Sequence, residues 1–391
     1  MKLYPWIAVC VVLVIMAAIG VAAVLPPRAL PVFDFIMLYS AGLGIIERVP
    51  VYDNAAIINL AIDRLNIRDD FTIFPYPYPP WYALSFFHLA FLPLTKAADA
   101  WMVLNASMLL TATFLLTDRW TPLARALAAL AALVFLPSLG LMVVGQYSAP
   151  VVLGAALFVY ASRRENAPLA ALGLLLMTFK PHIGLFLLPA GFLWLVFQKT
   201  PFARRALWIS LAGGLLLAAL GFLADPAWPL TYIRSVASYT TVPGVANRDL
   251  SASFPAFIVK TVLGYGSGFW ANLLSVAVIG ILLVLFWRFK IFFRLETLVP
   301  GCALMTLLGD PYMFNYDYVL MLLPLAYLAG QAKSTAQRSV VAIAYLLPLT
   351  SLWLERDANI LYAIAAILLA VILLQKTRKD ALLPSLTPAP P

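Results

Sequence analysis

The stretch LLLMTFKPHIGLFLLP (174–189) places a lysine, a proline and a histidine between two apolar runs. The two runs predict helices over 167–179 and 183–197, which Lys180, the proline and His182 separate. Neither helix has the roughly 20 residues that a membrane crossing needs. We therefore expect the break to lie below the membrane surface, where irregular backbone is tolerated only against protein or a water-filled cavity.

The composition of the whole chain agrees with this stretch. Of its 391 residues, 63% are hydrophobic and 11% are charged, and the mean hydropathy is +0.94. An average soluble domain is roughly 25% charged. We predict an all-α, polytopic integral membrane protein with a single transmembrane domain over 1–375. Twelve spans are predicted, at 6–25, 101–117, 126–144, 148–161, 167–179, 183–197, 206–223, 269–287, 297–309, 317–330, 338–354 and 358–375.

Basic residues are distributed unevenly over the loops between these spans. With the N-terminus inside, the inside segments hold 16 Lys and Arg residues and 4 acids, and the outside segments hold 10 basic and 13 acidic residues. Cytoplasmic loops carry such an excess of Lys and Arg. We therefore expect both termini to be cytoplasmic. The net charge of +9 has the same explanation, so no nucleic-acid partner is expected.

Three long or polar segments then face outward. They are the first outer loop (26–100), a second large loop (224–268) and the short segment 309–318. Within the first, PPWYALSFFHLAFLPL (79–94) is interpreted as a juxtamembrane helix, although a short span is an alternative. The run 6–25 is interpreted as an uncleaved first helix rather than a signal peptide. The proline-rich tail, 376–391, is predicted to be disordered and cytoplasmic.

Lys180 is the residue that this topology explains least easily. A lysine within the membrane is costly unless it faces a cavity or an opposite charge. We expect it to meet an anion, and a phosphate near the outer leaflet is the candidate that we favour. A lysine that extends to the headgroups is the alternative. His182 could donate to the same phosphate.

Asp34 follows the first span and is flanked by Phe33 and Phe35. A carboxylate between aromatic rings at the membrane face is poorly solvated. Such a group suits a general base if a substrate hydroxyl can reach it. It could equally be the N-cap of a helix that starts near Ile36, and the residues alone leave both roles open.

Further polar and aromatic residues are expected at the same outer level. The stretch FTIFPYPYPPWYA (71–83) has four prolines, so it cannot be one helix. Its aromatics form either a membrane belt or a surface for sugars and lipids. The other candidates lie at the ends of predicted spans and in the second loop: Gln146, Tyr147, Asn247, Arg248, Asp249, Asp310, Tyr312, Asn315, Tyr316 and Asp317.

Several common signatures are missing from the sequence. It has no P-loop or HExxH motif, and its acidic residues show no metal-ligand spacing. Cys10 and Cys302 both lie in apolar runs, which predicts no disulfide framework. We therefore expect no metal and no cofactor.

Five stretches resemble the GT-C membrane glycosyltransferases, in particular family 87, the polyprenyl-phosphate-mannose-dependent mannosyltransferases. They are DFIMLYSAGLGIIERVPVYD, FPYPYPPWYALSFFHLAFLPLTKAADAWMVLN, VVGQYSAPVVLGAAL, LAALGLLLMTFKPHIGLFLLP and DPYMFNYDYVLMLLP, which together span about 34–325. The resemblance implies a sugar donor linked to a lipid phosphate, a lipid or glycan acceptor, and a site on the non-cytoplasmic face. It also implies a bacterial inner membrane.

The same resemblance implies roles for particular residues. Asp34 matches the family's catalytic base, and Lys180 matches the lysine of its Lys-Pro motif. The residues that match its other substrate-site positions are Tyr39, Tyr52, Tyr78, Gln146, His182, Arg248, Tyr312, Tyr316 and Asp317. The implied reaction is an inverting displacement without a metal.

Two other functions are compatible with a polytopic chain. A transporter or lipid flippase would place polar groups near the bilayer midplane on repeated, broken helices. Here the polar groups are expected at one face, and the sequence shows no repeat. A non-catalytic scaffold of envelope assembly is the third possibility, but a scaffold gives no reason for Lys180 at depth.

Overall fold

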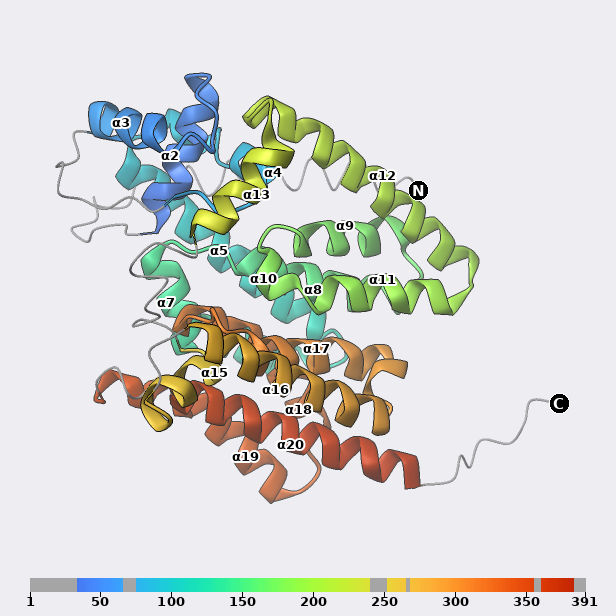
Figure 1. The fold of residues 1–391 in the computed structure, drawn as a ribbon. Coiled ribbons are helices and arrows are strands. Elements are labelled where there is room, and N and C mark those ends of the chain that lie inside the picture. The colour runs from blue at the N-terminus through green and yellow to red at the C-terminus, as the bar shows by residue number, and fades with distance from the viewer. Residues whose placement is uncertain (1–33, 66–74, 240–251, 265–267, 355–359, 383–391) are drawn as a thin grey trace.

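The structure, a computed structural model, describes residues 34–65, 75–239, 252–264, 268–354 and 360–382. Within these ranges every regular element is a helix, which confirms the all-α prediction. The predicted span 6–25 and the tail after residue 382 lie outside the described residues. The prediction of a disordered tail from residue 376 is wrong for 376–382, which form the last turns of α20 (Ile360–Leu382). Figure 1 shows the helices running roughly side by side, with the segments of the first outer loop gathered at one end of the bundle.

The first outer loop folds into short helices around an aromatic core. They are α2 (Phe35–Ile46), α3 (Asn54–Leu65), α4 (Pro80–Leu84) and the 3-10 helix η1 (Leu89–Phe91). Phe35, Tyr82 and Phe86 are completely buried in this core. Such burial of aromatic rings holds the loop to the ends of the long helices.

The prediction of a single juxtamembrane helix over 79–94 is wrong. Pro80 starts α4, but the helix ends at Leu84, and the chain then turns before η1. The hydroxyl of Ser85 donates to the carbonyl of Tyr82 at 2.7 Å, a local bond that competes with the continuation of a helix. Elements this short cannot cross a membrane.

Within the residues that the structure describes, five helices are long and apolar enough to cross a membrane. They are α5 (Leu94–Leu116), the segment Pro181–Gln198, α12 (Pro201–Ala224), α16 (Gly268–Arg288) and the part of α20 over Ile360–Arg378. A sixth is the pair α6 (Pro122–Val134) and α7 (Leu136–Val144), if its 53° bend lies within one span. The predicted number of about twelve is not confirmed. The segment from Pro181 is also longer than the predicted 183–197, because its proline begins the helix. The candidate span Pro181–Gln198 consists of α10 (Pro181–Gly184) and α11 (Leu187–Gln198).

The remaining helices fill the interior or connect the longer ones. They are α8 (Ala149–Ser162), α9 (Ala167–Met177), α13 (Trp228–Tyr239), α15 (Phe254–Phe257), the π-helical turn η2 (Ile258–Val262), η3 (Ile291–Phe293), α17 (Leu295–Gly309), η4 (Asn315–Met321), α18 (Leu322–Gln331), α19 (Thr335–Leu346) and η5 (Leu347–Leu352). Every residue of α17 except Glu296 is buried, whereas α12 and α16 leave large apolar side chains exposed. That arrangement suits a bundle whose outer helices face lipid.

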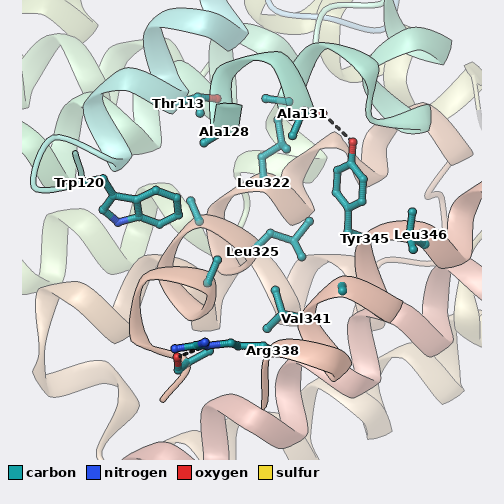
Figure 2. Close-up of a pocket in the computed structure, with 15 residues that line it drawn as sticks. Thr113, Trp120, Ala128, Ala131, Leu322, Leu325, Arg338, Val341, Tyr345 and Leu346 are labelled. Carbon is teal, nitrogen blue, oxygen red and sulfur yellow. Dashed lines mark hydrogen bonds between the residues drawn. The ribbon is translucent and has the colours of Figure 1, made fainter. Parts of the chain in front are cut away.

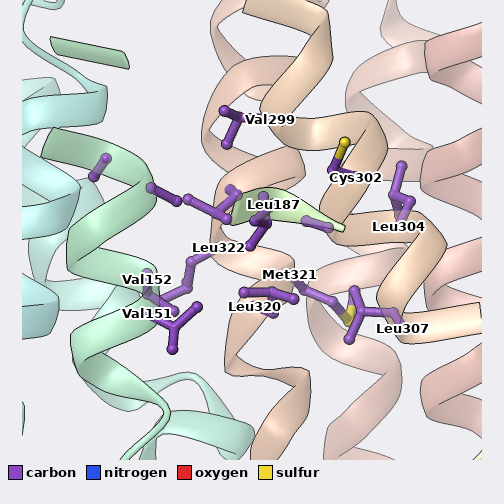
Figure 3. Close-up of a cluster of buried hydrophobic side chains, with 14 of the residues drawn as sticks. Val151, Val152, Leu187, Val299, Cys302, Leu304, Leu307, Leu320, Met321 and Leu322 are labelled. Atoms are coloured by element: carbon purple, nitrogen blue, oxygen red, sulfur yellow. The ribbon is translucent and has the colours of Figure 1, made fainter. Parts of the chain in front are cut away.

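Two contacts position the centre of the bundle. Helices α8 and α9 touch through Gly154 and Gly173, where an added Cβ would lie 2.6 Å from the opposite carbonyl oxygen. Small residues allow such close approach between membrane helices. Figure 3 shows side chains of α8, α17 and the η4–α18 segment packed together, with Val152, Leu307 and Leu320 among them. This packing brings the ends of α7, α9 and α17 close to one another.

Candidate active site

Asp34 is the residue immediately before α2. Its backbone N–H donates to the carbonyl of Val144 at 3.3 Å, which joins the start of α2 to the end of α7. Its side chain makes no capping hydrogen bond to α2. The carboxylate instead accepts a hydrogen bond from the amide Nε2 of Gln146 at 2.5 Å. Asp34 thus occupies the N-cap position, but its side chain does not act as a cap.

Gln146 is held rigidly by its backbone. Gly145 ends α7 with a φ of 79°, and an added Cβ there would lie 2.5 Å from Cβ of Phe35. The ring N–H of Trp101 and the amide of Asn105, both on α5, donate to the carbonyl of Gln146 at 3.1 and 2.9 Å. The side chain therefore leaves a fixed point between α2 and α5.

The side-chain amide of Gln146 has a defined orientation. Its Nε2 donates to Asp34 and, at 3.2 Å, to the hydroxyl of Tyr316. Its Oε1 accepts from the ammonium of Lys180 at 3.2 Å. A flipped amide would place N–H against an ammonium and an oxygen against a carboxylate, so the partners at each end favour the observed orientation.

Lys180 lies at the break between α9 and α10, where Pro181 begins the next helix. The lysine is 2% exposed, and its partner Asp317 is 0% exposed. The ammonium pairs with Asp317 Oδ1 at 2.5 Å and donates to Ser148 Oγ at 3.0 Å. It also lies 4.8 Å from the ring centre of Tyr147 and 5.0 Å from that of Tyr316.

The anion that Lys180 meets in this structure is therefore a carboxylate of the same chain. Its three N–H groups have three protein acceptors: Asp317, Ser148 and Gln146. An ammonium has only three donors. Direct binding of a donor phosphate by Lys180 stays a prediction, and it would require one of these hydrogen bonds to open.

His182 is more accessible than Lys180. Its side chain is 32% exposed, and its Nε2 lies 3.8 Å from Asp317 Oδ2. Tyr316 stacks on Phe314 at 5.4 Å between ring centres and reaches Gln146 through its hydroxyl. Tyr312 donates its backbone N–H to Asp310, and Arg248 lies outside the described residues. The structure thus unites Asp34, Gln146, Lys180, Tyr316 and Asp317 from four separate segments, with His182 at their edge.

The sequence model of glycosyltransferase family 87 matches residues 76–310 of the chain. The chain belongs to glycosyltransferase family 87. The matched segment contains Gln146 and Lys180, whereas Asp34 and Asp317 lie outside it. A comparison with curated proteins gave no match.

Three tyrosines that the resemblance to family 87 singled out lie in the core of the first outer loop. The hydroxyl of Tyr39 donates to the carbonyl of Leu92, and that of Tyr52 donates to the carbonyl of Tyr78, each at 2.6 Å. The ring of Tyr78 meets that of Tyr147 at 4.3 Å between centres. Tyr78 is therefore one ring away from Lys180, whereas Tyr39 and Tyr52 hold loop segments together.

We expect Tyr39→Phe to destabilise this family 87 glycosyltransferase by about 1 kcal/mol, because it removes one buried hydrogen bond. The transfer rate of the folded protein should not change. Thermal unfolding in detergent and a rate measured per folded molecule would check both statements. A large loss of rate without a loss of stability would instead place Tyr39 in the reaction.

Ser148 is the site residue that the sequence analysis did not single out. Its hydroxyl donates to Asp317 Oδ1 at 2.6 Å while it accepts from Lys180. The quoted stretch VVGQYSAPVVLGAAL includes this serine, but a serine just before a predicted span can face either the helix or a neighbour. Only the packing of α8 against η4 distinguishes the two.

The surroundings of Asp34 affect its protonation. Burial raises the pKa of the Asp34 carboxyl above its usual range, whereas the Gln146 amide and the charge of Lys180 act in the opposite direction. A base with a raised pKa binds a proton more tightly, and catalysis favours a pKa close to the working pH. Among the described residues no group of three or more His, Cys, Asp or Glu side chains is placed to hold a metal.

Proposed function

We propose that this family 87 glycosyltransferase moves a hexose, with mannose as the favoured sugar, from a polyprenyl-phosphate donor to a hydroxyl of a lipid or glycan acceptor. The observation that carries the proposal is the Asp34 carboxylate, which the side-chain amide of Gln146 holds at the start of α2. The proposed site faces the non-cytoplasmic side of a bacterial inner membrane. In this proposal both termini are cytoplasmic.

The proposed reaction is a single displacement. Asp34 takes the proton of the acceptor hydroxyl as the acceptor oxygen bonds to the anomeric carbon. The bond from that carbon to the phosphate oxygen breaks, and its electron pair leaves with the lipid phosphate. Attack from the face opposite the leaving group inverts the anomeric carbon. The phosphate is already a stable anion, so no metal or cofactor is required by this scheme.

Gln146 and Lys180 have positioning roles in the proposal. The amide of Gln146 donates to Asp34 while its oxygen accepts from Lys180. The lysine thereby keeps the N–H end of the amide toward the carboxylate. An amide donor also stabilises the ionised form of a base. Lys180 consequently acts on Asp34 through Gln146, and Asp317 and Ser148 hold Lys180 in place.

The leaving phosphate needs positive charge near it. His182 is the partly exposed side chain at the edge of the cluster, and we assign it to the phosphate together with Arg248 from the second outer loop. Lys180 adds its charge at longer range, or directly if its pair with Asp317 opens. Tyr78, Tyr312 and Tyr316 are proposed to line the substrate side of the site.

The pH dependence of transfer tests the role of Asp34. A base acts only when ionised, so the rate should fall as the pH drops through the pKa of Asp34, and at a higher pH than for an ordinary carboxyl. Gln146→Ala removes the amide that favours ionisation. Because a hydrogen bond to a charged group contributes about 1.5–3 kcal/mol, the acid limb should move upward by about one pH unit or more.

Initial rates of transfer from pH 4 to 9 would locate the acid limb of the pH–rate profile in wild type and in Gln146→Ala. Tyr39→Phe is the control, and its acid limb should not move. A limb in the ordinary carboxyl range, unchanged by Gln146→Ala, would remove Asp34 from the role of base.

A further inference from the structure

A cavity of about 540 Å³ lies between α5, α6, α18 and α19. Its volume is within the roughly 300–1,000 Å³ typical of small-molecule sites. Eleven of its fifteen lining residues are alanine, valine or leucine. Figure 2 shows Leu322, Leu325 and Val341 at its centre, with Trp120, Tyr345 and Arg338 around them.

The walls offer almost no hydrogen bonds to an occupant. Thr113 donates its hydroxyl to the carbonyl of Leu109 at 2.8 Å, and Tyr345 donates to that of Ala131 at 2.9 Å. The two hydroxyl groups of the lining are thus engaged within the protein. An apolar cavity of this kind does not hold water well, and hydrocarbon is the occupant that its lining fits.

Arg338 gives the cavity one charged end. It is an exposed residue near the start of α19, and its Nε donates to the carbonyl of Ala332 at 3.2 Å. Trp120 lies at the same end of α18, where an added Cβ on Gly330 would be 2.8 Å from its Nε1. Tryptophan and arginine are typical of the headgroup level of a membrane.

This end lies far from the Asp34 cluster along the bundle. Helix α18 begins at Leu322, five positions after Asp317, and ends at Gln331, just before Ala332. The polar cluster and Arg338 therefore lie near opposite ends of α18. The headgroup of a ligand that pairs with Arg338 would therefore lie at the opposite end of α18 from the candidate active site, which distinguishes it from the donor of the proposed reaction.

We propose that this cavity binds a membrane phospholipid with an anionic headgroup. One acyl chain fills the space between the alanine-rich walls, and the phosphate pairs with Arg338. Basic residues at pockets between membrane helices recognise anionic lipids in this way. The inference depends on the cavity and its charged end, and it stands apart from the transfer reaction.

Native mass spectrometry of the full-length protein, stripped of lipid and titrated with phosphatidylglycerol or phosphatidylcholine, tests the proposal. Wild type should retain phosphatidylglycerol preferentially. Arg338→Gln should weaken that binding on the order of fivefold, which corresponds to about 1 kcal/mol for one basic residue. Lys333→Gln is the matched control, since it removes a neighbouring exposed charge that does not line the cavity. It should bind as wild type does.

Ala342→Phe fills the cavity and should abolish retention of both lipids. Equal retention of the two lipids by wild type, or unchanged binding in Arg338→Gln, would overturn the proposal. Displacement of phosphatidylglycerol by polyprenyl phosphate at equal concentration would also overturn it. Arg338 is exposed, so its variant should fold and decides the question even if Ala342→Phe does not fold.

Discussion

Asp34→Asn is expected to lower the rate of sugar transfer by about 10²–10⁴-fold, the usual contribution of a general base. The amide has nearly the same shape as the carboxylate but cannot accept the acceptor's proton. It can still face Gln146 after a rotation of either amide, so the protein should insert and remain folded. Rates from membranes with matched amounts of folded protein would measure the loss.

Asp53→Asn is the matched control for this variant. Asp53 belongs to the same outer loop, but it is exposed and accepts the N–H of Ala56 at 3.1 Å. Its variant should transfer sugar at close to the wild-type rate. If Asp34→Asn stays within about threefold of wild type, which is less than a base typically contributes, the proton acceptor is another group.

Lys180→Met is expected to destabilise the fold by about 3–5 kcal/mol, because it leaves the carboxylate of Asp317 buried without its counter-charge. Asp317 is 0% exposed, so water cannot replace the ammonium. Ser148 would keep only one of its two partners in the cluster. Thermal unfolding in detergent, followed by loss of the monodisperse peak, would measure the effect.

The double variant Lys180→Met with Asp317→Asn serves as the control. The amide oxygen of Asn at position 317 still accepts from Ser148, but neither member of the former pair carries a charge. Most of the lost stability should therefore return. Transfer should stay low, because the Oε1 of Gln146 has lost the ammonium that orients it. A stable single variant would show that the pair is not the main support of this region.

The sequence predicted which residues belong to the site better than it predicted which of them contact one another. Asp34, Gln146, Lys180 and Asp317 were all expected at one level of the membrane, because each stands at the end of an apolar run. Asp317, the residue that pairs with Lys180, is 137 positions further along the chain. Helical period and hydropathy do not determine which helix ends meet, so the predicted partner was a phosphate.

For the fold, the positions of the helices could be predicted from the sequence, but the number of membrane spans could not. Apolar runs gave helices at the right places, since in lipid only helices satisfy the backbone of an open chain. The number of helices that cross the membrane could not be predicted in the same way. Helices α8, α9 and α17 are apolar but shorter than the roughly 17 residues that a span needs. Buried short helices and true spans have the same composition. The prediction of one helix over 79–94 was wrong for a local reason, because the hydroxyl of Ser85 donates to the carbonyl of Tyr82.

The central claim is that a lipid phosphate carries the sugar and that Asp34 activates the acceptor. The most direct measurement is sugar transfer to membrane acceptors from labelled polyprenyl-phosphate-mannose and from the corresponding nucleotide sugar, with wild type and Asp34→Asn side by side. We predict transfer from the lipid-linked donor alone, and only by wild type. Transfer from the nucleotide sugar, or equal transfer by both proteins, would contradict the account.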